Sequence, residues 1–159
     1  TTRAANRPDV MTEVGFYHLL HWPLERALPK LLEKALERGH RAIVLAGSPE
    51  RVEDLNNVLW TYDDQSWLPH GSSGDGPAQE QPIFLTVADE NPNGADVLVA
   101  VDGRAPAMAS GFARIIDMFD GGDETMVAAA RQRWRGYLDQ GFDLTYWQQT
   151  ETGGWDKKT

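Results

Sequence analysis

The feature that most constrains the fold is an uninterrupted apolar run at residues 41–46 that leads directly into a helix-start signal. The run reads Arg-Ala-Ile-Val-Leu-Ala, and a strand without polar alternation is typical of a parallel sheet covered on both faces. It is followed by Gly47-Ser48-Pro49-Glu50, in which Ser48 is the expected N-cap and Pro49 the first helical residue. A buried strand that passes at once into a helix predicts a layered α/β domain.

Strand and helix patterns alternate along most of the chain. Strands are expected at 15–20, 41–46, 82–87, 96–101 and 114–119, although the last segment also fits a helix continuing from residue 107. Helices are expected at about 29–38, 49–60 and 123–138. The alternation predicts a three-layer α/β fold, with a mostly parallel five-stranded sheet flanked by helices. The fold would be Rossmann-like but without a nucleotide-binding loop.

The 159 residues are expected to form a single domain over 14–147. Residues 1–13 are predicted to be a disordered lead, and residues 148–159 a frayed C-terminal tail. The chain has no cysteine, no apolar run long enough to span a bilayer and no apolar segment near residue 1 that would mark a secretory signal. These features predict a cytoplasmic protein without a membrane partner.

The formal net charge of −9 argues against nucleic-acid binding through the overall field of the protein. Single-strand binding also needs a basic groove lined by stacking aromatic rings, and no such groove is visible in the sequence. Direct binding of nucleic acid is therefore not expected.

Motifs that would indicate an enzyme are missing from the sequence. It contains no Walker phosphate loop, no dinucleotide-binding glycine pattern after a strand and no nucleophile elbow. His18 and His21 have a spacing that can bind metal on a helix, but on a strand entering a turn they would face different directions. No catalytic residue, metal or cofactor is therefore predicted. The alternative is a small α/β nucleotide or phosphoester enzyme whose site the sequence does not reveal.

Two tryptophans lie beside a loop that cannot build a core. A predicted helix ends near Trp60, Trp67 and Pro69 follow, and the run from 71 to 77 is rich in Gly, Ser and Asp. Large aromatics and prolines at such a position are typical of a partner-binding surface. The other interpretation is that Trp60 closes the helix onto the core and Trp67 covers a cavity.

The last predicted helix carries a second candidate surface. Arg131, Trp134 and Arg135 are spaced i, i+3 and i+4, so they share one face of the helix. Two guanidinium groups around an indole would suit a peptide that is both acidic and apolar. Alternatively, Trp134 belongs to the core and the arginines form an ordinary solvated face.

From about residue 15 to 147, the chain resembles the chi subunit family of bacterial DNA polymerase III holoenzyme. The spacing from Trp60 to Trp67, Pro69 and His70 is the most specific landmark. The others are Phe16-Tyr17, Gly39-His40-Arg41, the segment 55–60, the block Ala130-Arg131-Gln132-Arg133-Trp134-Arg135-Gly136-Tyr137 and Gly141-Phe142.

The resemblance implies a non-catalytic adaptor of the clamp-loader complex. It implies that the psi subunit binds at Trp60, Trp67 and Pro69, with Trp67 standing where better-known relatives have Phe. It also implies that Arg131, Trp134 and Arg135 hold the acidic C-terminal tail of single-stranded DNA-binding protein. One departure is that the family can carry a lysine one turn before Arg131, where this chain has Val127, which weakens the basic pocket.

Overall fold

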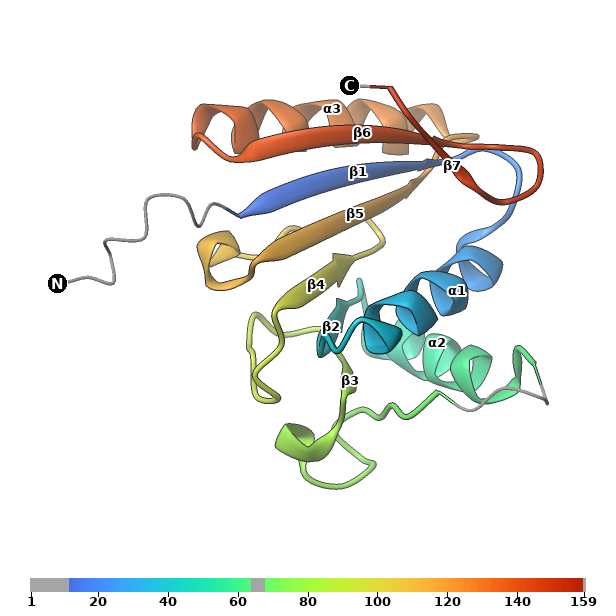
Figure 1. Cartoon of the computed structure of the whole chain (residues 1–159), viewed down its shortest axis with the longest axis vertical. Coiled ribbons are helices and arrows are strands. Elements are labelled where there is room, and N and C mark those ends of the chain that lie inside the picture. The colour runs from blue at the N-terminus through green and yellow to red at the C-terminus, as the bar shows by residue number, and fades with distance from the viewer. Residues whose placement is uncertain (1–11, 64–67, 159) are drawn as a thin grey trace, which may run out of the picture.

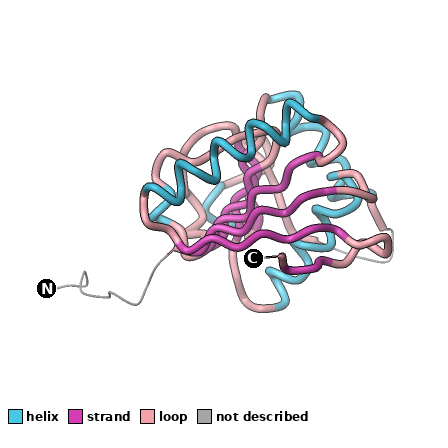
Figure 2. Tube along the Cα trace, turned by 90° about the horizontal axis from the view of Figure 1, so that it is seen from above, coloured by secondary structure: helices cyan, strands magenta, loops and turns pink. Residues whose placement is uncertain are grey.

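The computed structural model describes residues 12–63 and 68–158, which form one seven-stranded sheet with helices on both faces (Figures 1 and 2). The strand order is β3-β2-β4-β5-β1-β6-β7, and every neighbouring pair is parallel except β6 and β7. The strands are β1 (Glu13–Leu19), β2 (Ala42–Leu45), β3 (Ile83–Thr86), β4 (Val97–Ala100), β5 (Arg114–Asp120), β6 (Asp143–Gln149) and β7 (Trp155–Lys157). The predicted three-layer, mostly parallel α/β fold is confirmed, but the sheet has seven strands and not five.

Three α-helices complete the layers. Helices α1 (Leu24–Glu37) and α2 (Pro49–Thr61) cover one face of the sheet, and α3 (Glu124–Asp139) covers the other. Two short 3-10 helices, η1 (Ala78–Glu80) and η2 (Ala109–Gly111), lie in connecting loops. Each sheet face packs its own hydrophobic cluster, because the side chains of β1 alternate between the two faces.

The start of α2 agrees with the prediction from sequence, whereas the start of α1 does not. Ser48 Oγ accepts a hydrogen bond from Arg51 N at 3.1 Å, so the predicted N-cap of α2 is confirmed. In contrast, α1 begins at Leu24, about five residues before the predicted start, and Pro29 lies inside it. The carbonyl of Pro23 accepts hydrogen bonds from Arg26 N and Ala27 N, both at 3.0 Å, and so opens the first turn. The prediction that this helix starts near Pro29 is therefore wrong, because the helix begins directly after Pro23.

The segment predicted as a frayed tail beyond residue 147 is ordered in the structure up to residue 158. Gln148 and Gln149 end β6, which pairs in parallel with β1, and a tight turn leads back into β7. Gly153 has φ 86°, a conformation that favours glycine, and its amide donates to Thr150 O at 3.0 Å. The hairpin therefore adds two strands to the edge of the sheet beside β1.

At the other end, Glu13 begins β1, so the end of the predicted lead belongs to the sheet. Residues 1–11 lie outside the described residues. None of the described helices is both long and apolar enough to cross a membrane.

Candidate protein-binding surfaces

The first predicted surface consists of Trp60, Trp67 and Pro69, of which the structure describes Trp60 and Pro69. We call these two residues, together with the supporting His70, the α2 edge. Trp60 lies in the last turn of α2 and its side chain is 50% exposed. Its ring lies against the imidazole of His70, with centroids 4.2 Å apart. His70 is itself buried, and its ring nitrogens lie 2.6 Å from Leu68 O and 3.2 Å from Asn56 O. The exposed indole of Trp60 thus packs on an imidazole ring that is itself held in place.

The chain after the loop anchors this edge. Leu68 is buried in the cluster under α1 and α2, and Pro69 beside it is half-buried. Gly71 then pairs with β3, because Gly71 N donates to Ile83 O and Gly71 O accepts from Leu85 N. Trp67 lies outside the described residues, so its predicted exposure stays a prediction.

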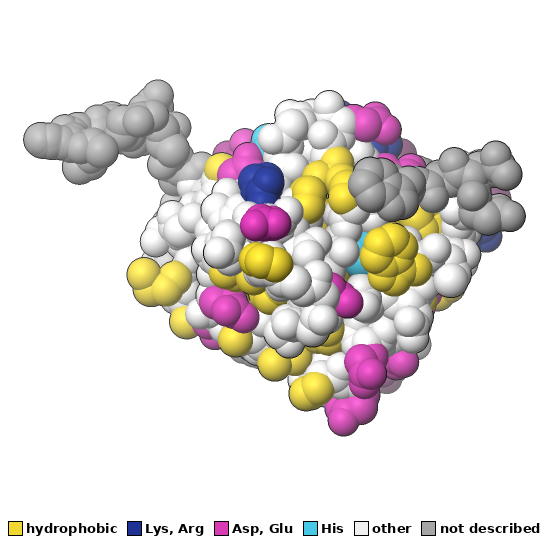
Figure 3. Space-filling model, turned by 90° about the horizontal axis from the view of Figure 1, so that it is seen from below, with side chains coloured by type: hydrophobic (Ala, Val, Ile, Leu, Met, Phe, Trp, Pro, Cys, Tyr) yellow, Lys and Arg dark blue, Asp and Glu magenta, His cyan; other side chains and the backbone are white. Residues whose placement is uncertain are grey.

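Viewed from the β3 side, hydrophobic and acidic side chains lie scattered over the surface, with few basic ones (Figure 3). Trp60 is one of four large hydrophobic residues that are strongly exposed among the described residues. Exposed aromatic surface of this kind suits an apolar partner more than an anionic one.

The second predicted surface, which we call the α3 face, consists of Arg131, Trp134 and Arg135. Trp134 is half-buried, and its ring lies 5.3 Å from that of Phe16 on β1 and 6.5 Å from that of Tyr146 on β6. Arg131 and Arg135 are exposed on either side of it. The indole packs onto the sheet while the two arginines are exposed, which fits the interpretation of Trp134 as part of the core. That this face also binds a peptide stays a prediction.

Arg133 has a different role from the neighbouring arginines. It turns inward and forms a two-pronged ion pair with Asp117 on β5, with Nε 2.6 Å from Oδ2 and Nη2 2.9 Å from Oδ1. Asp117 is 1% exposed, and burial raises the pKa of its carboxyl, an effect that the Arg133 guanidinium partly offsets. This pair fastens α3 to the sheet.

His18 and Tyr146 lie beside the α3 face, although neither was predicted to belong to it. His18 Nδ1 is 2.5 Å from the hydroxyl of Tyr146, while His18 Nε2 is buried without a hydrogen-bond partner among the described residues. Burial lowers the pKa of His18 and the charge of Arg131 acts in the same direction, while the backbone of Gly121 and the charge of Asp120 partly offset this effect. The alternation of β1 marks His18 as facing α3, but Tyr146 was missed because β6 was not recognised as a strand.

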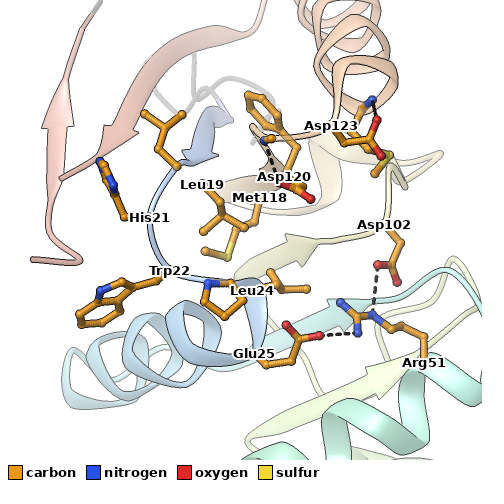
Figure 4. A pocket seen from close by; sticks show the side chains of 15 residues that line it. Leu19, His21, Trp22, Leu24, Glu25, Arg51, Asp102, Met118, Asp120 and Asp123 are labelled. Atoms are coloured by element: carbon orange, nitrogen blue, oxygen red, sulfur yellow. Dashed lines mark hydrogen bonds and ion pairs between the residues drawn. The ribbon is translucent and has the colours of Figure 1, made fainter. Parts of the chain in front are cut away.

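A pocket of about 590 Å³ lies at the carboxyl ends of β1 and β5, where a nucleotide would bind in a related sheet (Figure 4). Arg51 is the only Lys or Arg among its described lining residues, and its guanidinium is held by Glu25 at 2.8 Å and Asp102 at 3.1 Å. The hydrogen bond from Arg51 lowers the pKa of Glu25, so this carboxyl stays charged at neutral pH.

The backbone donors around this pocket are also engaged. Asp123 caps α3 by accepting from Thr125 N at 2.9 Å and Met126 N at 3.3 Å, and Asp120 accepts from Gly122 N at 2.8 Å. A phosphate would have to displace these carboxylates. The geometry therefore disfavours the alternative of a nucleotide or phosphoester enzyme at this position. Within the described part of the chain, no three His, Asp or Glu side chains are grouped so as to hold a metal ion.

Comparison with known proteins decides the family. A family model described as DNA polymerase III chi subunit, HolC matches residues 11–145. The chain belongs to this family. The match covers the α2 edge and the α3 face, but it ends inside β6, so the hairpin to β7 lies beyond the matched residues.

Individual chi relatives are only moderately similar. A protein of Rickettsia prowazekii named probable DNA polymerase III subunit chi is 34% identical over 57% of this chain and 55% of its own length. The chain thus matches about half of that relative. DNA polymerase III subunit chi of Pseudomonas aeruginosa is 25% identical over 84% of this chain and 94% of its own length. The Escherichia coli protein of the same name is 21% identical over 76% of this chain and 82% of its own length.

Proposed function

We propose that this chain is a non-catalytic accessory subunit of the DNA polymerase III clamp-loader complex, acting in DNA replication in the cytoplasm. In this proposal the psi subunit binds at Trp60, Trp67 and Pro69. The acidic C-terminal tail of single-stranded DNA-binding protein binds at Arg131, Trp134 and Arg135. The chain would bridge the two partners.

The observation that carries the proposal is that Trp60 is exposed and its ring is held in position by His70. In a chain of this family, half of a large indole is exposed on a buried histidine that two carbonyl groups hold in place. Such pre-positioning favours binding, because little side-chain freedom is lost when the partner arrives. Exposed, rigid tryptophans are also the residues that most often dominate the energy of protein interfaces.

The α3 face supports the second partner. Arg131 and Arg135 are exposed, and within the described chain neither has a carboxylate within ion-pair distance. Trp134 is half-buried on the same helix and offers an apolar contact, with the ring of Tyr146 6.5 Å from its own. Two free guanidinium groups beside an aromatic edge suit the carboxylates and the apolar terminal residue of an acidic tail.

We expect Trp60→Ala to weaken binding of a purified psi subunit by about 2 kcal/mol or more, as measured by isothermal titration calorimetry. The free energy of unfolding should change little, because the side chain is half exposed. Met108→Ala is the matched control, since Met108 is 70% exposed but lies elsewhere, in the loop before η2. Equal affinity of wild type, Trp60→Ala and Met108→Ala for psi would contradict the placement of this site.

A synthetic acidic peptide that ends in an apolar residue with a free carboxylate is expected to bind the α3 face with micromolar affinity. Arg131→Ala should weaken binding by roughly tenfold or more, and Arg131→Lys by less, if the guanidinium makes a two-pronged contact. Binding should weaken as salt is raised. Fluorescence anisotropy of a labelled peptide measures all three effects.

Two controls make this second test specific. Gln132→Ala changes an exposed residue of α3 outside the proposed contact and should leave peptide affinity unchanged. A scrambled peptide of equal charge should bind much more weakly than the ordered one. If the scrambled peptide binds equally well, the α3 face is an ordinary solvated surface.

A further inference from the structure

A groove of about 370 Å³ runs between α1 and the sheet edge built by β1, β6 and β7, on the opposite sheet face from α3. We call it the α1 groove. Its sheet side includes Trp147 and Trp155, and both residues lie beyond the family match, which ends at residue 145. The groove is therefore separate from both surfaces proposed above.

Aromatic rings form the sheet side of the groove. Tyr17 stacks on Trp147 with centroids 5.8 Å apart and planes at 11°, and Trp155 meets Tyr17 edge-on at 4.9 Å. Trp22 closes one end, where Gly153 packs so tightly that an added Cβ would lie 2.4 Å from the indole. Trp147, Trp155 and Trp22 are each half-buried, so part of each ring remains accessible.

Basic side chains form the opposite wall. Lys30 and Lys34 of α1 and Arg38, the residue that follows α1, recur every four residues, so they lie on one side of the helix. Arg114 of β5 adds a fourth cation from the sheet side. Within the described chain, none of these four side chains has a carboxylate within 4.0 Å. Lys30 and Arg38 are about 12 Å apart along the helix axis, so the row is long enough to contact more than one phosphate of a single strand.

The charge of the groove is opposite to that of the whole protein. The chain carries a formal net charge of −9, yet none of the described residues that line the groove is Asp or Glu. The nearest carboxylate partner of a lining residue is Asp96, which is paired with His40 at the groove end. A polyanion would thus meet local attraction there although the overall field opposes it.

We propose that the α1 groove binds a short stretch of single-stranded nucleic acid, with phosphates along the basic wall and bases against the tryptophans. A row of cations facing a row of flat rings is the arrangement by which proteins hold single strands without sequence preference. An acidic peptide would satisfy the cations but would leave most of the aromatic surface unused. The groove has no local sequence signature, because Lys30, Lys34 and Arg38 are more than 100 residues from Trp147 and Trp155 in the chain. Binding at this groove therefore departs from the expectation, based on net charge and sequence, that nucleic acid is not bound directly.

The test is a fluorescence anisotropy titration of the full chain with labelled oligo-dT and oligo-rU at low salt. We expect micromolar binding that quenches tryptophan fluorescence, and the relative affinities identify DNA or RNA as the preferred strand. Engaging three or four cations should give a slope of log K against log salt of about −2 to −3. A duplex of equal length should bind more weakly, since its bases cannot stack on the rings.

Paired variants locate the site. Lys34→Glu is expected to weaken binding about tenfold or more, whereas Lys158→Glu, the same charge change at an exposed residue that does not line the groove, should have a much smaller effect. Trp155→Ala should weaken binding and Trp155→Phe should restore most of it. Lys34→Glu should leave binding of the acidic peptide at the α3 face unchanged, so the two proposals can fail separately.

Three results would overturn the proposal. The first is the absence of oligonucleotide binding at low salt, including the case in which an acidic aromatic peptide occupies the groove instead. The second is equal loss in Lys34→Glu and Lys158→Glu, which would show attraction by net charge alone. The third is duplex affinity equal to that of the single strand, which would leave the tryptophans without a role.

Discussion

Replacing Arg133 with methionine is expected to lower the free energy of unfolding by about 3–5 kcal/mol at neutral pH, because a buried carboxylate then loses its partner. Asp117 is 1% exposed and accepts two side-chain hydrogen bonds, both from Arg133. Methionine preserves much of the volume and the apolar contact of the arginine stem, so the change isolates the charge. Urea unfolding followed by circular dichroism measures the loss.

The same variant should show a characteristic pH dependence. Burial already raises the pKa of Asp117, and removing the guanidinium raises it further above the unfolded value of about 3.9. A group with a raised folded-state pKa contributes stability below its unfolded pKa and loses it as pH rises through the folded value. The deficit of Arg133→Met relative to wild type should therefore be small in acid and grow toward pH 8.

Two controls accompany the Arg133 variant. Arg131→Met makes the same change at an exposed position of α3 and should shift the free energy of unfolding by no more than about 0.5 kcal/mol. Adding Asp117→Asn to Arg133→Met removes the buried charge and should recover much of the loss. A loss below about 1 kcal/mol that does not vary with pH would show that the pair is not what fastens α3.

Gln149→Leu is expected to cost about 2–4 kcal/mol of unfolding free energy, because one side-chain oxygen organises the whole β1–α1 connection. Gln149 Oε1 accepts hydrogen bonds from the amides of Leu20, His21 and Trp22, at 3.1, 2.8 and 2.7 Å. Gln149 is 3% exposed, and leucine has a similar size but no acceptor. The loss should appear in chemical unfolding and as faster hydrogen exchange at the three amides.

Gln149→Glu is the matched control for Gln149→Leu. It keeps an oxygen at the three donors and replaces an amide nitrogen that has no hydrogen-bond partner among the described residues. Backbone amides stabilise a carboxylate, so this variant should stay close to wild type. Unchanged stability and unchanged amide exchange in Gln149→Leu would mean that the connection is held by other contacts.

The central sheet could be predicted because its strands carry their signal locally. The run at 41–46 is apolar throughout, since the strand is buried on both faces, and Ser48 caps the next helix through a contact three residues away. Strands β6 and β7 lack such a signal. Most of β6 is half-buried, and it is ordered by pairing with β1 about 130 residues earlier, an interaction that no local pattern encodes.

The candidate surfaces were predictable only in part, for a similar reason. Helical spacing predicts that Arg131, Trp134 and Arg135 share one face of α3, but it does not show that Arg133 reaches a carboxylate on β5. Trp60 could have been core or surface on sequence alone, because the support of its ring comes from His70 across the loop. The α1 groove was missed because β7 was predicted to be part of a frayed tail.

The strand order also fixes how far apart the two proposed partners are held. The α2 edge lies beside β3, and the α3 face lies over β1 and β6, which places β6 five strand spacings from β3. At about 4.8 Å per spacing this is roughly 24 Å, about three times the distance over which physiological salt screens a charge. Binding of one partner should therefore not change the affinity for the other, so Trp60→Ala should leave peptide affinity unchanged and Arg131→Ala should leave psi affinity unchanged. The sheet would then hold the two partners at a fixed separation without transmitting a signal between them.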